Sequence, residues 1–277
     1  MGRVGARRNS ARQGHEQPED RWAARPVADP HRVRLLSKPN QTGSWWAPPT
    51  GRGGPQHIPR PPAARLGGPP PWSGLRAQDR VARLDQLIER LATRSAQVVE
   101  GGPTAATASA VLCVLYEDEG ELHVVLTRRS PNMRHHAHEI SFPGGRQDPS
   151  DADLWATALR ESAEEIGLDP GTVVPVGQLD SFVTVGSRSL IHPFVAVCAG
   201  RPVVEVASPR EVEAVVHVSL AELLSDEVWR EEIWQFDDRG ERALTFFEIV
   251  GDTIWGATGA MLRQLLAIAT DTEAQSG

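Results

Sequence analysis

The stretch 141–168 reads SFPGGRQDPSDADLWATALRESAEEIGL and decides the fold. Its Pro-Gly-Gly at 143–145 predicts an irregular loop, because proline fixes φ and glycine admits backbone conformations that are closed to other residues. Beyond this loop, apolar side chains recur at helical spacing over 153–166, and Gly167 is well placed to end a helix. The stretch therefore predicts a glycine loop that leads into an amphipathic helix.

Three glutamates lie close together on the expected helix. Glu161, Glu164 and Glu165 stand at positions i, i+3 and i+4, so we expect them to share one face. Like charges at that spacing repel each other and destabilise a helix. Such a face is either solvated or holds a divalent cation, and its place behind a glycine loop favours the cation.

The rest of the ordered chain alternates between strands and helices. Apolar runs typical of strands lie at 111–116, 122–127, 173–179, 190–197, 212–218 and 244–250. Helical patterns lie at 78–93, 220–225 and 257–269. A turn at 117–120 joins the first two strands into a hairpin. This mixture predicts an α/β sandwich domain over 76–270, followed by a disordered tail at 271–277.

Residues 1–75 differ in composition from the remainder. They hold 13 of the 22 prolines and 10 of the 25 glycines, and 12 Lys/Arg against 4 Asp/Glu. The other 202 residues carry 17 Lys/Arg against 32 Asp/Glu. Because so few aliphatic side chains cannot offset the entropy of ordering, we expect a disordered basic arm before the domain.

Composition also excludes several classes of protein. No stretch approaches the roughly 18 apolar residues of a membrane span, and no apolar segment follows the N-terminal charges, so we expect a cytoplasmic protein. Cys113 and Cys198 are too few for a disulfide framework and are expected to be core thiols. The basic arm is a candidate for nucleic-acid binding. However, the chain has 28 arginines and one lysine, which is equally typical of a protein from a GC-rich genome. The net negative charge of the domain argues against nucleic acid as a partner.

The helix and its loop resemble a known family motif. Gly145, Asp151 and the run Arg160-Glu-Ser-Ala-Glu-Glu-Ile-Gly-Leu168 are similar to the Nudix box, G-x5-E-x7-R-E-U-x-E-E-x-G-U, where U is a bulky apolar residue. The chain departs from the pattern in having Asp151 for the first Glu, one extra residue before Arg160, and Ser162 for the first U. The first two departures are shared by a Nudix subgroup that contains coenzyme A diphosphatases.

An upstream stretch resembles a second signature of that subgroup, L-L-T-x-R-[SA]-x3-R-x3-G-x3-F-P-G-G. The chain matches it from 125 to 145, except for Val125 in place of the first leucine and His138 in place of the glycine. The resemblance thus covers 125–168 closely and continues more weakly to about residue 270. It implies a Nudix-fold α/β/α sandwich with a mixed sheet.

The resemblance also implies roles for individual residues. Glu161 and Glu165 would be the principal ligands of Mg²⁺ or Mn²⁺, with Glu164 an auxiliary ligand or base and the Gly145 carbonyl a further ligand. Arg160 would orient a box glutamate. The residues implied in substrate binding are Arg129, Arg134, Gly144 and Gly145.

The implied activity is hydrolysis of the diphosphate bond in coenzyme A or acyl-coenzyme A, giving 3′,5′-ADP and 4′-phosphopantetheine or its acyl form. A carboxylate face would repel this polyanion unless a metal ion reversed the local field. Two alternatives remain open: hydrolysis of another nucleoside diphosphate derivative, such as a dinucleotide or nucleotide sugar, and a ligand-binding Nudix module without turnover. Homodimers are common among relatives of this kind. The acyl preference, the general base and the effect of His138 on substrate choice stay open.

Overall fold

The computed structural model describes residues 51–54, 56–98, 108–184, 189–236 and 240–273, all within one compact unit, Pro48–Gly277. Residues 1–50 and 274–277 lie outside the described part, and so do most of the expected basic arm and most of the expected tail.

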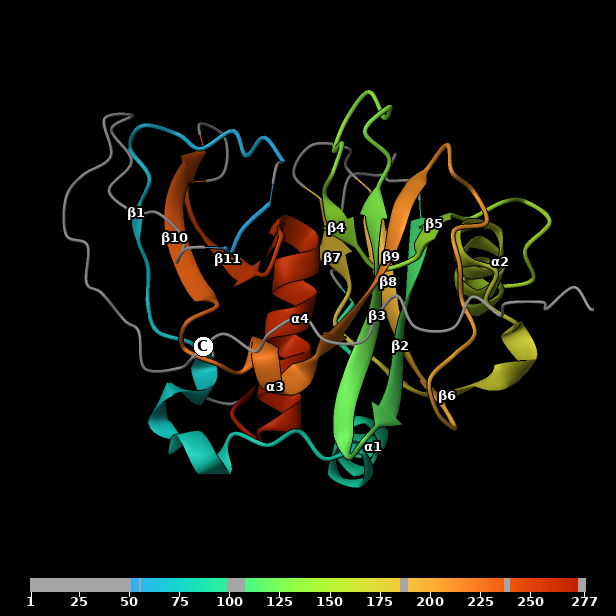
Figure 1. The fold of residues 1–277 in the computed structure, drawn as a ribbon, viewed down its shortest axis with the longest axis horizontal. Coiled ribbons are helices and arrows are strands. Elements are labelled where there is room, and N and C mark those ends of the chain that lie inside the picture. The colour runs from blue at the N-terminus through green and yellow to red at the C-terminus, as the bar shows by residue number, and fades with distance from the viewer. Residues whose placement is uncertain (1–50, 55, 99–107, 185–188, 237–239, 274–277) are drawn as a thin grey trace, which may run out of the picture. The chain divides into compact units, whose positions relative to one another are not determined.

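Among the described residues the strands form two sheets (Figure 1). The larger has eight strands, in the order β4-β3-β2-β8-β6, with β5 on β2, β7 on β8 and β9 on β3. Their bounds are β2 (Ala108–Asp118), β3 (Glu121–Arg129), β4 (Ile140–Ser141), β5 (Gly144–Arg146), β6 (Val173–Gln178), β7 (Phe182–Val183), β8 (Leu190–Cys198) and β9 (Val212–Ser219). β2 and β8 are parallel and the other pairs antiparallel, so the expected mixed sheet is confirmed.

Helices cover both faces of this sheet. α2 (Leu154–Ile166) packs on one face, and α1 (Leu84–Thr93) and α4 (Gly256–Ala269) pack on the other, while α3 (Leu220–Leu223) directly follows β9. The expected helices over 153–166 and 257–269 agree with α2 and α4 to within one residue. The helix expected over 78–93 begins only at Leu84, since Ala77–Asp79 form a separate 3-10 turn and Arg83 before α1 is extended. The α/β/α sandwich is therefore confirmed.

The second sheet was only partly expected. It consists of β1 (Arg65–Leu66), β10 (Trp229–Phe236), β11 (Gly240–Ile249) and β12 (Asp252–Trp255), all antiparallel. β10 escaped the pattern because its buried side carries charge: Arg230 and Glu232 are buried and ion-paired with each other. A search for apolar alternation cannot find such a strand.

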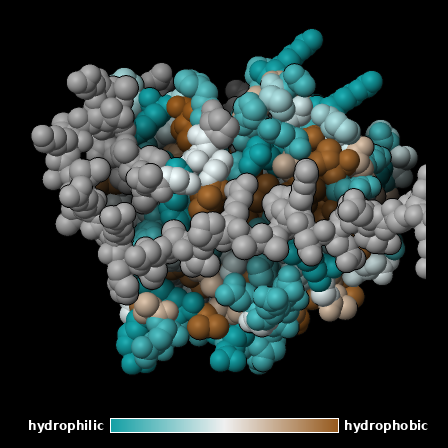
Figure 2. All heavy atoms as spheres, viewed as in Figure 1, coloured by the Kyte–Doolittle hydropathy of each residue, from teal (hydrophilic) through white to brown (hydrophobic). Residues whose placement is uncertain are grey.

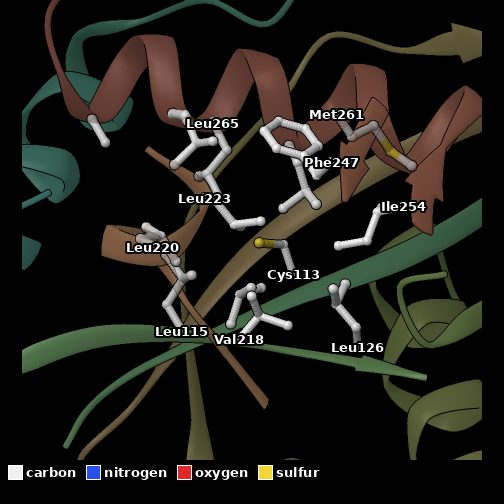
Figure 3. Packing of buried hydrophobic residues seen from close by; sticks show 14 of the residues in the cluster. Cys113, Leu115, Leu126, Val218, Leu220, Leu223, Phe247, Ile254, Met261 and Leu265 are labelled. Carbon is white, nitrogen blue, oxygen red and sulfur yellow. The ribbon is translucent and has the colours of Figure 1, made fainter. Parts of the chain in front are cut away.

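The main core lies between the larger sheet and α4. Cys113 of β2 sits at its centre, surrounded by side chains from α4, β9, β11 and β12 (Figure 3). Cys113 and Cys198 are both buried free thiols, as expected, and burial raises the pKa of Cys113. No helix of the described residues combines the length and apolarity that a membrane span requires.

Residues 51–54 and 56–74 pack with the domain, although composition assigned them to the arm. Trp72 is fully buried, its Nε1 donates to the Leu224 carbonyl oxygen at 3.1 Å, and its ring meets Trp229 edge-to-face with centroids 5.4 Å apart. β1 pairs with β10. One large aromatic thus anchors a segment whose average composition is that of a disordered chain, and we propose that the domain begins before residue 75.

Candidate active site

α2 presents the box glutamates with its ends fixed on both sides. Asp153 caps the N-terminus, its carboxylate accepting from the Ala156 N–H at 2.7 Å. Gly167 ends the helix in the left-handed conformation, with φ of 65°, as the sequence predicts. The helix turns Glu161 and Glu165 inward, whereas the side chain of Glu164 is 59% exposed. The expected shared face is thus two inward carboxylates and one solvated carboxylate.

The glycine loop is shaped around these two carboxylates. The Gly144 N–H donates to Glu165 Oε2 at 3.1 Å, and a Cβ on Gly144 would lie 2.3 Å from the Ala110 carbonyl oxygen. A Cβ on Gly145 would lie 2.4 Å from Glu161 Cδ. The Glu161 carboxylate therefore rests on the bare backbone of Gly145, and only glycine permits this approach.

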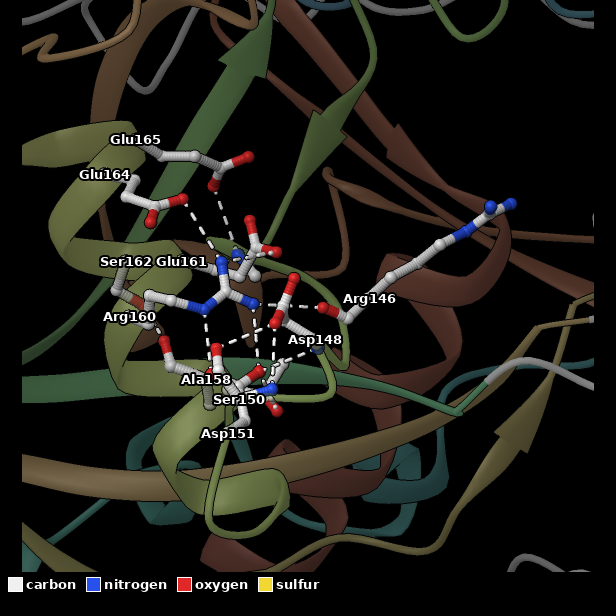
Figure 4. A network of polar contacts seen from close by, with 12 residues as sticks. Arg146, Asp148, Ser150, Asp151, Ala158, Arg160, Glu161, Ser162, Glu164 and Glu165 are labelled. Carbon is white, nitrogen blue, oxygen red and sulfur yellow. Dashed lines mark hydrogen bonds and ion pairs between the residues drawn. The ribbon is translucent and has the colours of Figure 1, made fainter.

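Arg160 ties the loop to the helix (Figure 4). Its guanidinium donates to both oxygens of Asp151, at 2.9 and 3.0 Å, and to the Arg146 carbonyl oxygen at 3.1 Å. It also lies 3.1 Å from Glu161 Oε1 and 3.2 Å from Glu164 Oε2. Asp151, which stands where the motif has its first glutamate, is thus engaged with Arg160, and this contact holds the pKa of its carboxyl well below the usual range.

Burial governs the charge state of the inward pair. It raises the pKa of Glu165 to about 7, although the Gly144 N–H and the charge of Arg129 act in the opposite direction. It also raises the pKa of Glu161, against the effect of Arg160. Carboxylates held out of water in this way need a cation to remain charged.

A fourth carboxylate acts on this pair through its charge and was missed in the sequence. The charge of Glu211 raises the pKa of both Glu161 and Glu165. Glu211 lies just before β9, in a segment that the main chain of Glu165 fixes by accepting from the N–H groups of Ala207 and Ser208. No motif marks Glu211, since only the fold brings it to α2.

The two arginines expected to bind substrate differ in their surroundings. Arg129 ends β3 close enough to lower the pKa of Glu165 electrostatically, and its Nε is buried without a hydrogen-bond partner. Arg134 is exposed and makes no hydrogen bond or ion pair with a described residue. Of the two, the structure brings Arg129 to the carboxylates.

His138 adopts the conformation that a glycine would favour. Its φ is 61°, and its Nδ1 lies 3.0 Å from Glu213 Oε2 on β9. The histidine therefore occupies the left-handed region, and its ring is fixed against a neighbouring strand.

The site suits a hard divalent cation in its chemistry. Glu161, Glu165 and Glu211 offer carboxylate oxygens, the ligands that Mg²⁺ prefers, and their mutual repulsion calls for positive charge. Within the described chain, no three His, Cys, Asp or Glu side chains are already gathered into a metal cage. A few carboxylates with water and substrate oxygens are enough for Mg²⁺.

Comparisons with known proteins agree with this geometry. The NUDIX domain family matches residues 106–239. The Citrobacter koseri protein named "Uncharacterized Nudix hydrolase NudL" is 30% identical over 183 residues, which cover 66% of this chain and 92% of that protein. The chain belongs to the Nudix hydrolase family.

Two further Nudix relatives bear on function. The Caenorhabditis elegans "Peroxisomal coenzyme A diphosphatase ndx-8" is 33% identical over 170 residues, which cover 57% of this chain and 70% of that protein. "Nudix hydrolase 22, chloroplastic" of Arabidopsis thaliana is 38% identical over 161 residues, which cover 56% of this chain and 52% of that protein. The chain thus spans about half the length of this last relative.

Proposed function

We propose that this Nudix protein hydrolyses the diphosphate bond of coenzyme A or acyl-coenzyme A in the presence of Mg²⁺ or Mn²⁺, releasing 3′,5′-ADP and 4′-phosphopantetheine or its acyl form. One observation carries the proposal: α2 sets two inward carboxylates, the partly buried Glu161 and the buried Glu165, directly on the glycine loop at Gly144 and Gly145. Buried like charges destabilise a fold, so their retention supports a charge-dependent function.

Glu161 and Glu165 would hold the metal, with the Gly145 carbonyl and Glu164 as further ligands. The bound metal would neutralise the diphosphate and activate the attacking water. Arg160 positions Glu161 through their ion pair, and the Gly144 N–H positions Glu165. The charge of Glu211 acts on both inward carboxylates, and Arg160 pairs with Glu164, so Glu211 and Glu164 are the two candidates to accept a proton from the water.

The choice of coenzyme A rests on the upstream signature and on the name of one relative. Coenzyme A carries a 3′-phosphate besides its diphosphate, and guanidinium groups bind phosphate well. Arg129 and Arg134 would supply them. The cytoplasm remains our proposed location, although relatives are named for the chloroplast, the mitochondrion and the peroxisome.

The test is chromatography of products after incubation with Mg²⁺ or Mn²⁺ and a panel of substrates: coenzyme A, acetyl-coenzyme A, NADH, ADP-ribose and a diadenosine polyphosphate. We expect 3′,5′-ADP from coenzyme A, its loss on chelation and in Glu165→Gln, and its retention in Glu205→Gln, an exposed control near the end of α2. Cleavage of another member alone would refute coenzyme A as the substrate. No cleavage with either metal would favour a ligand-binding module.

A further inference from the structure

The loop between β3 and β4 contacts the segment that leads into β9 at two points. At one point the Ser130 N–H donates to the Glu211 carbonyl oxygen at 2.8 Å. At the other, His138 Nδ1 lies 3.0 Å from Glu213 Oε2. The loop projects from the end of the larger sheet (Figure 1), and its exposed side chains are hydrophilic (Figure 2). Its position therefore depends more on polar contacts such as these than on apolar packing.

Glu213 is an extra residue in the pairing of β9 with β3. Arg128 of β3 is opposite Ala214. The next residue of β3, Arg129, is opposite Val212, so Glu213 has no partner on β3 and the strand bulges there. Bulges redirect the chain and are common beside active sites. This bulge thus decides the direction in which the chain enters β9.

The carboxylate of Glu211 has no anchor of its own. Glu211 is exposed, and in the described part of the chain its side chain makes no hydrogen bond or ion pair. Its charge nevertheless raises the pKa of Glu161 and of Glu165, so it lies within reach of the candidate metal site. Its direction therefore follows from the main chain on either side, which Ser130 holds at Glu211 itself and His138 holds at the bulge.

We propose that His138 is a positioning residue, which through Glu213 holds the carboxylate of Glu211 toward the metal-binding carboxylates of α2. This role rests on the metal site of the proposed function and deepens it. The upstream signature has a glycine at this position, so the signature itself does not supply the contact with Glu213.

The contact needs both the ring and the backbone of His138. An ionised carboxylate only accepts hydrogen bonds, so Nδ1 carries the donated proton. The φ of His138 is 61°, a conformation that few residues other than glycine adopt, and its N–H closes the loop by donating to the Arg129 carbonyl oxygen at 3.2 Å. Arg128, whose charge also interacts with Glu213, is already bound to both oxygens of Asp252. His138 is therefore the group that fixes Glu213.

Mn²⁺ binding to the full chain, measured by electron paramagnetic resonance, tests this role without turnover. Binding at the site is identified by its loss in Glu165→Gln. His138→Gly removes the ring and permits the same backbone conformation, and we expect it to lower the Mn²⁺ affinity by about tenfold, as for groups that orient metal ligands. His138→Asn should keep the affinity of the wild type, because asparagine tolerates this conformation and its amide nitrogen is as many bonds from the main chain as Nδ1.

Two comparisons separate positioning from a general effect on the loop. The matched control is His136→Gly: His136 has a φ of 60° and its Nδ1 lies 2.9 Å from Glu139 Oε2, but this pair stays within the loop, so Mn²⁺ affinity should not change. Glu211→Gln should itself lower the affinity. Added to Glu211→Gln, His138→Gly should cause no further loss, because its effect passes through the charge of Glu211.

Three outcomes overturn the role of His138: unchanged Mn²⁺ affinity in His138→Gly, an equal loss with and without the charge of Glu211, or a loss in His138→Asn as large as that in His138→Gly. A wild-type chain that binds no Mn²⁺ at this site refutes the metal site and the role of His138 together. If the variants behave as expected and no substrate of the panel is cleaved, the proposed hydrolysis alone fails.

Discussion

Gly145→Ala should damage activity while leaving the fold intact. The added methyl would lie 2.4 Å from Glu161 Cδ and 2.5 Å from Oε1, whereas ordinary contact begins near 3.4 Å. The backbone of Gly145 is not in the left-handed region, so alanine adds no backbone strain there. The carboxylate of Glu161, at the end of a flexible and partly exposed side chain, must give way.

The required displacement sets the size of the effect. Moving Glu161 Cδ from 2.4 to 3.4 Å shifts the carboxylate by about 1 Å, and misplacement of a catalytic group by that much can cost on the order of 100-fold in rate. This corresponds to about 2.7 kcal/mol of transition-state stabilisation. Stability should change by less than about 1 kcal/mol, as for a substitution that only a mobile side chain opposes.

Steady-state kinetics with the substrate that the panel identifies, together with urea unfolding, check this prediction. Gly144→Ala is the matched comparison: its φ is 147° and its Cβ would strike the Ala110 carbonyl oxygen, so it should lose stability first. Gly200→Ala, with nothing within 4 Å of the added methyl, should change neither property. Full activity in Gly145→Ala would show that the contact between Gly145 and Glu161 is irrelevant to catalysis.

Three further predictions concern the fold. Trp72→Ala should lower the free energy of unfolding by about 3–5 kcal/mol in urea, because the ring is fully buried; a loss under about 1 kcal/mol would contradict its anchoring role. Arg128→Met should lower the free energy of unfolding by about 3–5 kcal/mol, and by more than Asp252→Asn does. The arginine donates to both oxygens of the buried Asp252 carboxylate, and its removal leaves that charge without a partner. Equal losses in the two variants would refute this. Burial lowers the pKa of His217 to about 4, below the roughly 6.5 of an unfolded histidine, so the unfolded chain binds the proton first and this residue's contribution to stability falls as pH drops from 6.5 toward 4. The raised pKa of Glu165 acts in the opposite direction over the same range, so the test is the difference between thermal melts of the wild type and of His217→Gln, which should shift against the wild type as pH drops; a difference that does not change with pH would refute this prediction.

Local patterns predicted much of the site. The turn of α2 that carries Glu161 and Glu165, its stop at Gly167 and the glycine loop at Gly144 depend on spacing within one short segment. Such features follow from helix periodicity and backbone conformation, which a sequence displays directly. The outward turn of Glu164 was not visible, because the position of the glycine loop against α2 decides which carboxylates are covered.

The misses depended on contacts between distant segments. Glu211 reaches the site because the main chain before β9 binds the end of α2. The buried side of β10 carries charged residues that form ion pairs, such as Arg230 with Glu232, and a search for apolar alternation does not find such a strand. The role of Arg134 stays a prediction, since it is exposed and contacts no described partner by hydrogen bond or ion pair.

The pairing of β1 with β10 bears on how the chain is made. Arg65 is opposite Ile233, so these partners are separated by 168 residues of chain. During synthesis the N-terminal segment emerges first, yet it must wait for β10 before it can pair, and Trp72 must wait for Leu224 and Trp229 before its ring is covered. A ribosome stalled between Trp72 and β10 would therefore carry a nascent chain in which this tryptophan is exposed, which is the kind of surface that chaperones bind.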